Sequence, residues 1–291
     1  MTKPFKSLLR DLWTSLGHER EVNLFLMASY WPPSEEVEKL LPQAHPKSPP
    51  LTIWERISRN SRLPTAYESF LRNLESAINS LIKSEAELVV IKRVFRTKTR
   101  IIVGFGPSGW DISLIHMLKP YGVPWIPGSS LKGAMESAAQ EELMKVVGNN
   151  SELKNVIHKY KEHRLEDLTG KIKTLAELFG TKYFRGRLIV LGGFINSVPS
   201  GGYMTVDVIS PHYKRYYESK GEVPPSESMV PVPIKFPAVR EGTQFTFILL
   251  MPNRKNYVEF VSEILEKTLT KYGIGGKTSA GYGLFEKAKA D

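Results

Sequence analysis

The sequence of 291 residues contains no cysteine. Disulfide frameworks, thiolate zinc sites and cysteine nucleophiles are therefore excluded together. The chain also lacks any apolar run close to the roughly 20 residues that a membrane-spanning helix needs. Residues 1–20 mix charged side chains with Leu and Trp and have no apolar stretch typical of a secretory signal. We therefore expect a soluble cytoplasmic protein that does not associate with a membrane.

Histidine is scarce, and its spacing does not predict a metal site. The chain has 6 histidines, and no pair of them forms a His-Glu-x-x-His motif. His158 and His163 are five positions apart, so they do not share one face of a helix. His116 and His212 are the candidates for a metal-independent acid or base, but a structural or RNA-stacking role is favoured. We expect no catalytic residue, no metal and no cofactor.

Acidic residues are outnumbered by basic ones. The chain has 40 Lys and Arg against 30 Asp and Glu, which gives a formal charge of +10. This charge favours association with a polyanion such as nucleic acid, although basic surface also serves simple solubility. The hydrophobic content of 41% is ordinary for a globular protein, so a sizeable core is expected.

The order of the predicted elements favours an α+β fold with antiparallel sheets, because helices are too few to alternate with every strand. Proline clusters mark residues 1–60 as an N-terminal extension of unknown function. Residues 61–185 and 186–291 are predicted to form two modules, each a split β-α-β unit. Thr65 and Glu68 are predicted to form a capping box at the first helix. Helices are predicted over Thr65–Ile82, Ser129–Val147, Ser151–Leu168, Lys171–Phe179 and Tyr257–Tyr272, and strands over Leu88–Phe95, Arg100–Val103, Leu188–Leu191, Tyr203–Val208, Val230–Phe236 and Gln244–Met251.

The first motif that suggests chemistry is Pro-Trp-Ile-Pro-Gly-Ser-Ser-Leu-Lys-Gly over residues 124–133. It brings Gly128, Ser129, Ser130 and Lys132 to the start of a predicted helix, where free N–H groups and the helix dipole favour anions. Ser129 or Ser130 is expected to cap this helix, while the amides and Lys132 face a phosphate. Plain capping, with Lys132 as a solvated surface charge, is an equally weighted alternative.

The second motif is a glycine-rich segment over residues 273–283, directly after the last predicted helix. Its spacing excludes a P-loop, which needs four residues between its first Gly and Gly-Lys-Ser/Thr and precedes a helix. Glycines do allow backbone amides to approach a bound phosphate closely. The candidate RNA contacts here are Gly273, Gly275, Gly276, Lys277 and Thr278, and a flexible helix end with a turn is the alternative.

A third candidate is the Pro-His-Tyr-Lys-Arg-Tyr-Tyr run over residues 211–217. Its rings and cations suit stacking on unpaired bases and pairing with phosphates. The residues that carry this hypothesis are His212, Tyr213, Lys214 and Arg215. Packing of the tyrosines against a neighbouring subunit is at least as well favoured, because interfaces also enrich Tyr and Arg.

The first two motifs together resemble the RAMP superfamily of CRISPR-associated proteins, whose members share the Ile-Pro-Gly-Ser-Ser-Leu-Lys-Gly element and a C-terminal glycine-rich loop. The segment 97–106 resembles the strand of that family that ends in glycine. The resemblance implies two ferredoxin-like, RRM-like modules that grip RNA.

Residues 206–217 and 231–236 are similar to the family of sixth subunits of the type III-B Cmr effector complex. That resemblance implies a non-catalytic subunit that binds guide RNA near its 3′ end and contacts other RAMP subunits, with target RNA met indirectly. It also implies that another subunit cleaves the target. The alternative function is a RAMP-type, metal-independent endoribonuclease that processes CRISPR precursor RNA, because that class needs only one well-placed histidine.

Overall fold

The computed structural model describes residues 63–85, 87–104, 116–210, 216, 218–226 and 234–288. The predicted N-terminal extension, residues 1–60, lies outside this range. The described part is a mixed α and β structure with antiparallel sheets, which confirms the predicted class. Within it, no helix is both long and apolar enough to cross a membrane.

The main sheet has six strands in the order β2-β3-β4-β7-β1-β8, and each neighbouring pair is antiparallel. The strands are β1 (Leu88–Thr97), β2 (Met117–Leu118), β3 (Val123–Pro127), β4 (Ile189–Ser197), β7 (Gln244–Pro252) and β8 (Phe285–Lys287). Strands β2, β3 and β8 are short and were not predicted, since each carries too few residues to show a period of two.

Strand β7 lies at the centre of the sheet and is covered on both faces. Phe247 and Leu249 point into the main hydrophobic core, while Ile248 and Leu250 belong to a second apolar cluster on the other face. Successive side chains of a strand point to opposite faces, so a strand covered on both sides must be apolar throughout. The continuous apolar run over 247–251 therefore marks the middle of a three-layer arrangement.

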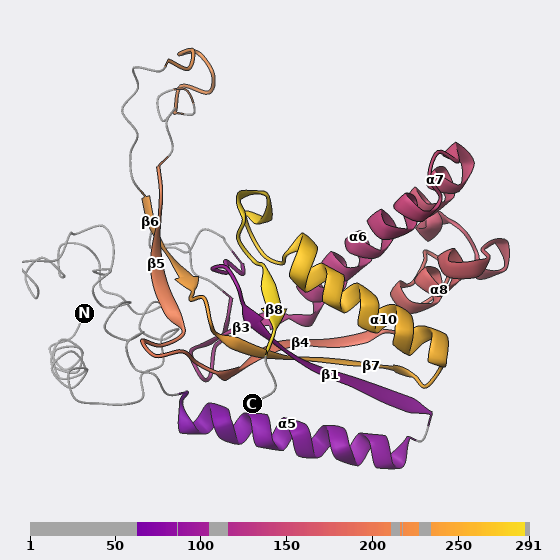
Figure 1. Cartoon of the computed structure of the whole chain (residues 1–291), viewed down its shortest axis with the longest axis horizontal. Coiled ribbons are helices and arrows are strands. Elements are labelled where there is room, and N and C mark those ends of the chain that lie inside the picture. The colour runs from indigo at the N-terminus through magenta and orange to yellow at the C-terminus, as the bar shows by residue number, and fades with distance from the viewer. Residues whose placement is uncertain are drawn as a thin grey trace, which may run out of the picture.

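Helices cover the two faces of the sheet unequally (Figure 1). Of the described helices, only α5 (Thr65–Ser84) lies on one face, where Phe70, Leu71 and Leu74 pack on the cluster around Phe194. Helices α6 (Gly128–Val146), α8 (Gly170–Phe179) and α10 (Lys255–Lys267) cover the other face. The π-helical turn η3 (Thr268–Tyr272) continues α10 and ends at Gly273.

Two predicted helix caps are wrong, and proline is the reason. Helix α5 begins after Pro64 and helix α6 after Pro127, and neither N-cap makes a side-chain hydrogen bond. Thr65 thus occupies the first helical position instead of capping the helix with Glu68. Ser129 likewise lies inside the first turn of α6. Each proline occupies the N-cap position in an extended conformation, and its ring offers no acceptor for the amides of the first turn.

The predicted helix over Ser151–Leu168 is broken into three pieces. Helix α7 spans Ser151–His158, and two short 3₁₀ turns follow, η1 (Tyr160–Glu162) and η2 (Leu165–Asp167). The expected strand over Arg100–Val103 is also wrong, because only Ile101 forms a bridge, to Val239. The remaining predicted elements occur within a few residues of their expected ends, with β4 extending well beyond Leu191.

The main sheet interleaves strands from both predicted modules. Strand β1, from the stretch 61–185, lies between β7 and β8, which come from the stretch 186–291. The predicted boundary at residues 185 and 186 therefore does not separate two sheets. Sequence order alone does not reveal this, because which strands become neighbours is decided by the return path of the chain.

A separate two-stranded sheet extends from one end of the main sheet (Figure 1). It pairs β5 (Met204–Ile209) with β6 (Ile234–Val239) in an antiparallel hairpin. The base of the hairpin is held by the bridge between Ile101 and Val239 and by a small cluster of Ile102, Phe236 and Ala238. The hairpin is thus anchored next to the glycine-rich segment.

Candidate nucleic-acid interface

Gly128, the first residue of α6, is held tightly against strand β4. A Cβ at this position would lie 1.9 Å from the carbonyl oxygen of Val190, a distance that no side chain tolerates. A Cβ at Gly192 of β4, where φ is +124°, would lie 2.3 Å from the carbonyl oxygen of Ile126 on β3. Glycine is required at Gly128 because the helix start and β4 touch through their backbones. Packing thus explains Gly128 without an RNA ligand.

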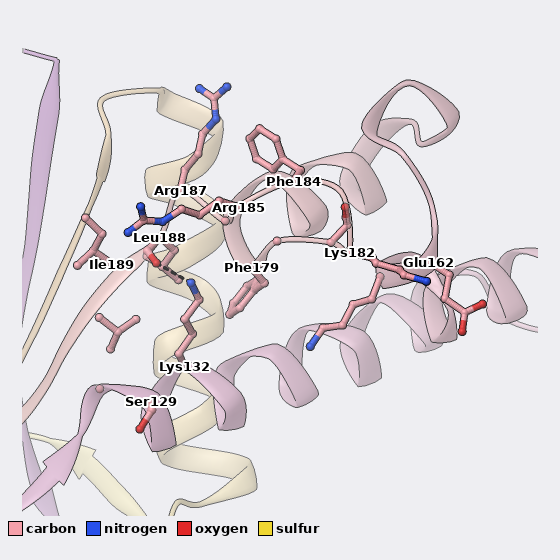
Figure 2. A pocket seen from close by; sticks show the side chains of 16 residues that line it. Ser129, Lys132, Glu162, Phe179, Lys182, Phe184, Arg185, Arg187, Leu188 and Ile189 are labelled. Atoms are coloured by element: carbon pink, nitrogen blue, oxygen red, sulfur yellow. Dashed lines mark hydrogen bonds between the residues drawn. The ribbon is translucent and has the colours of Figure 1, made fainter.

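Lys132 follows one turn later, and its side chain is half-buried. Its Nζ donates a hydrogen bond to the carbonyl oxygen of Leu188 at 2.7 Å (Figure 2). Burial lowers the pKa of the Lys132 ammonium, and Arg185 and Lys161 act in the same direction against Glu136. The alternative of a fully solvated charge is therefore wrong.

Lys132 lines an open pocket of about 1070 Å³ between the start of α6 and the segment 179–190. We call it the basic pocket. Ser129 at its edge is exposed. Figure 2 shows Lys132, Arg185 and Arg187 on one side of the pocket and Lys182 and Glu162 on the other. The charged residues of its lining are Lys132, Lys161, Lys182, Arg185, Arg187 and Glu162.

A pinched loop over residues 180–187 forms one wall of this pocket. Gly180 and Gly186 meet so closely that a Cβ on Gly186 would lie 2.6 Å from the carbonyl oxygen of Leu178. Backbone hydrogen bonds close the loop, from Thr181 N–H to the Phe184 carbonyl at 2.8 Å and from Arg187 N–H to the Glu177 carbonyl at 2.9 Å. The loop is therefore a rigid platform that displays Lys182, Tyr183 and Arg185 to solvent.

In the glycine-rich segment, several backbone amides are used within the protein. The N–H of Gly276 donates to the Ile102 carbonyl at 2.7 Å, and that of Gly283 donates to the Arg100 carbonyl at 2.9 Å. Gly275 has φ of +100°, and a Cβ there would lie 2.3 Å from the oxygen of Ile102. The Gly276 amide is thus committed to the fold instead of facing a phosphate, and Gly275 and Gly273 (φ +78°) are required by backbone geometry.

Lys277 is the exposed cation of this segment. It adopts the left-handed conformation, with φ of 60°, and precedes the 3₁₀ turn η4 (Thr278–Ala280). Its carbonyl accepts hydrogen bonds from the amides of Ala280 and Tyr282. The backbone is therefore fixed while the side chain remains in solvent, and Thr278 beside it is half-buried.

An ion-pair network ties the glycine-rich segment to the β5–β6 hairpin. Asp207 Oδ2 on β5 accepts a hydrogen bond from Tyr282 Oη at 2.7 Å and lies 2.8 Å from the Arg100 guanidinium. Partial burial opposes ionisation, but these two donors hold the pKa of Asp207 below its ordinary value. Arg100 Nε also lies 3.2 Å from Glu241. The glycine-rich segment is thus held beside the β5–β6 hairpin by Tyr282 and Arg100, and Arg100 also pairs with Glu241.

The two motifs begin at opposite ends of α6. Ser130 lies in the first turn of the helix, while Lys145 near its last turn donates a hydrogen bond to Tyr272 Oη at 2.8 Å, directly before Gly273. At a rise of about 1.5 Å per residue, these helix positions are roughly 22 Å apart. The lining of the basic pocket, as the structure describes it, includes no residue of the glycine-rich segment.

Several candidate residues of the third motif, His212, Tyr213, Lys214 and Arg215, lie outside the described residues. His116 is described and exposed, and its ring lies against Gly104. In the described part of the chain, no group of three or more His, Asp or Glu side chains is placed to hold a metal ion.

The cations of the loop 180–187 were not predicted as RNA contacts from the sequence. The signal was present, because two aromatic residues stand between basic residues in Lys-Tyr-Phe-Arg-Gly-Arg over residues 182–187. Such interleaving is typical of nucleic-acid contacts. What the sequence did not show is that this loop lies opposite Lys132, 50 residues earlier in the chain.

A family model matches most of this structure. The model of the RAMP superfamily covers residues 94–286, from β1 through β8. The chain belongs to the RAMP superfamily. This finding confirms the family inferred from the two motifs, and both motifs lie inside the matched range.

Curated relatives and solved structures narrow the similarity to type III-B CRISPR systems. The chain is 24% identical to the Cmr6 subunit of the Pyrococcus furiosus CRISPR system, over 94% of this chain and 86% of that protein. It is 23% identical to the Cmr6 subunit of Saccharolobus solfataricus, over 82% of this chain and 71% of that protein. A chain of the type III-B Cmr-beta complex bound to cognate target RNA shares the fold, with a TM-score of 0.66, 19% identity and 98% of both chains covered.

Proposed function

We propose that this chain is a non-catalytic, RNA-binding structural subunit of a type III-B Cmr effector complex in antiviral defence. It binds guide RNA near its 3′ end and contacts neighbouring RAMP subunits, and it meets target RNA indirectly. The observation that carries the proposal is the alignment with a Cmr6 subunit, because it extends over 94% of this chain.

The fold supports this role as one ferredoxin-like unit instead of the two that the sequence predicted. Strands β1, β4, β7 and β8 with helices α6 and α10 follow the succession β-α-β-β-α-β, and the strands lie in the order β4-β7-β1-β8. Strands β2 and β3 extend the sheet beside β4. A four-stranded sheet of this kind is a common scaffold for RNA recognition.

The RNA contacts proposed here are a lysine and two serine side chains at the ends of elements. Lys277 supplies an exposed charge on a fixed backbone, and Ser129 and Ser130 are exposed on the first turn of α6. Single-stranded RNA binds through such charges because each neutralised phosphate releases counterions. The run His212–Arg215 remains a proposed contact on the basis of its sequence.

The proposal of a non-catalytic role rests on the surroundings of the described histidines. General acid–base cleavage of RNA needs a base and an acid placed near one phosphate. No ion pair in the described residues joins His116, His158 or His163 to a carboxylate. Incubation of the purified chain with CRISPR precursor RNA in EDTA tests this directly. Site-specific cleavage would favour the endoribonuclease instead.

The assembly role is tested by purifying the tagged chain from its source cell, followed by mass spectrometry and RNA sequencing. We expect other RAMP proteins to co-purify with guide RNA. Crosslinking is expected to map the chain to the 3′ portion of that RNA. Recovery of the chain without RNA and without RAMP partners would contradict the proposed function.

A further inference from the structure

The basic pocket contains more positive charge than the surrounding carboxylates neutralise. Lys161 is paired with Glu136 at 2.6 Å, and Glu136 also accepts a hydrogen bond from Tyr160 Oη at 2.6 Å. Among the residues that the structure describes, no carboxylate forms an ion pair with Lys182, Arg185 or Arg187. Glu162 alone contributes a negative charge to the lining.

This excess of positive charge favours the binding of an anion. Like charges gathered around one open pocket raise the local positive potential, and an anion that enters relieves their repulsion. The loop 180–187 is nevertheless built rigidly, with two glycines that permit its pinched backbone, and its Lys182 and Arg185 line the same pocket as Lys132. A folded protein retains such an arrangement where a ligand compensates the charge.

We propose that the basic pocket binds the backbone phosphates of single-stranded RNA, with Lys182, Arg185 and Arg187 as the principal contacts. This inference rests on the proposed RNA-binding function and adds a second contact region, away from the glycine-rich segment. Lys132 donates one N–H to the Leu188 carbonyl and lines the pocket, so the other N–H groups of its ammonium remain for a ligand. The volume of about 1070 Å³ exceeds that of one phosphate and accommodates a short stretch of backbone.

Aromatic residues on the same loop favour RNA over an acidic protein segment. Tyr183 is 59% exposed at the tip of the loop, and the Arg164 guanidinium lies 5.6 Å from the centre of its ring. Phe184 lines the pocket, with the Arg187 guanidinium 5.4 Å from its ring centre. Exposed rings beside phosphate-binding cations are the arrangement on which unpaired bases stack. Tyr183 is therefore assigned as the stacking residue.

The test compares two double variants of the full chain. Lys182→Ala with Arg185→Ala removes two exposed cations from the pocket. Arg72→Ala with Lys83→Ala removes the same two residue types from exposed positions on α5, across the sheet. Binding of a short, fluorescein-labelled single-stranded RNA is measured by anisotropy over a salt series, and thermal unfolding is measured on the same samples.

The pocket variant is expected to bind RNA at least about tenfold more weakly, and to reduce the slope of log affinity against log salt by roughly 1.4, since each phosphate contact contributes about 0.7. Its unfolding temperature should match that of the wild type, and the α5 variant should bind like the wild type. Tyr183→Ala should weaken binding by a further factor of about 5 without changing the salt slope, because stacking releases no counterion.

The outcomes separate this inference from the proposed function. If the wild type binds RNA and the pocket variant binds equally well, the pocket is not an RNA site, although the proposed function stands. If the pocket variant keeps its RNA affinity but no longer co-purifies with RAMP subunits, the pocket is a protein interface and this proposal is wrong. If the wild type does not bind single-stranded RNA, both proposals are contradicted.

Discussion

The start of α6 and the glycine-rich segment look alike in sequence, since each combines glycines with hydroxyl residues and one lysine. In the structure they differ in where the lysine goes. Lys132 is half-buried and bonded to the Leu188 carbonyl, whereas Lys277 stands in solvent on a left-handed corner. In each region one glycine, Gly128 or Gly275, is explained by close backbone contact. Glycine in such a motif thus indicates close packing of the backbone, and only the lysine indicates a ligand.

The largest effect is expected at Gly128. Gly128→Ala places a Cβ 1.9 Å from the Val190 carbonyl, so the start of α6 must move, and we expect a loss of about 2 to 4 kcal/mol in the free energy of unfolding. Chemical denaturation measures this loss. Gly133→Ala in the same helix is the control, because a Cβ there meets nothing within 4 Å. It should stabilise by up to about 1 kcal/mol. Equal effects at both positions would contradict the packing explanation.

The next effect separates two adjacent glycines of the other region. Gly275→Ala meets both a positive φ and the Ile102 carbonyl, so we expect a loss of about 2 to 3 kcal/mol. Gly276→Ala has contacts no closer than 3.7 Å and should change stability by less than about 0.5 kcal/mol. Thermal unfolding of the two single variants decides the matter. The RNA affinity of the Gly276→Ala protein should stay unchanged, because the amide of residue 276 donates within the fold. Weaker RNA binding would instead support a contact between this amide and a phosphate.

A smaller effect tests the brace on the glycine-rich segment. Asp207→Asn should destabilise the protein by about 1 to 2 kcal/mol, because Tyr282 and Arg100 lose a charged acceptor that is partly screened by solvent. The carboxylate has a folded pKa below its ordinary value of 3.8, so its contribution is fully present above that pH and is lost as the pH falls through the folded pKa. Denaturation measured over roughly pH 2 to 6 should therefore give free energies of unfolding that converge for the wild type and the variant at low pH. A constant gap would show that ionisation plays no part.

The smallest effects on stability are expected at Lys132 and Lys277. These two residues test most directly how the start of α6 differs from the glycine-rich segment. Lys277→Ala should leave the unfolding temperature unchanged and weaken RNA binding a few-fold, with a salt slope reduced by about 0.7. Lys132→Ala should also cost about 1 kcal/mol of stability, because the Leu188 carbonyl loses its donor. Measuring anisotropy and unfolding on the same samples separates the two roles. If the double variant Lys132→Ala with Lys277→Ala binds RNA as tightly as the wild type, neither lysine contacts RNA.

The sequence itself determined the class, the family and most of the elements. Helices α6, α8 and α10 and strands β1, β5 and β7 follow from periodicity, because one apolar face or a continuous apolar run leaves few alternatives. The RAMP resemblance followed from two local motifs, and the family model confirms it. These features are local, so neighbouring residues suffice to specify them.

Tertiary structure alone decided which strands are neighbours and what each motif faces. The insertion of β1 between β7 and β8 depends on long-range pairing, which joins strands from both predicted modules in the main sheet. The same pairing turned the amide of Gly276 toward Ile102 and Lys132 toward Leu188. It also brought the loop 180–187 opposite the start of α6, where the basic pocket forms. A side chain's chemistry is written in the sequence, but its partner is fixed only when distant backbone segments meet.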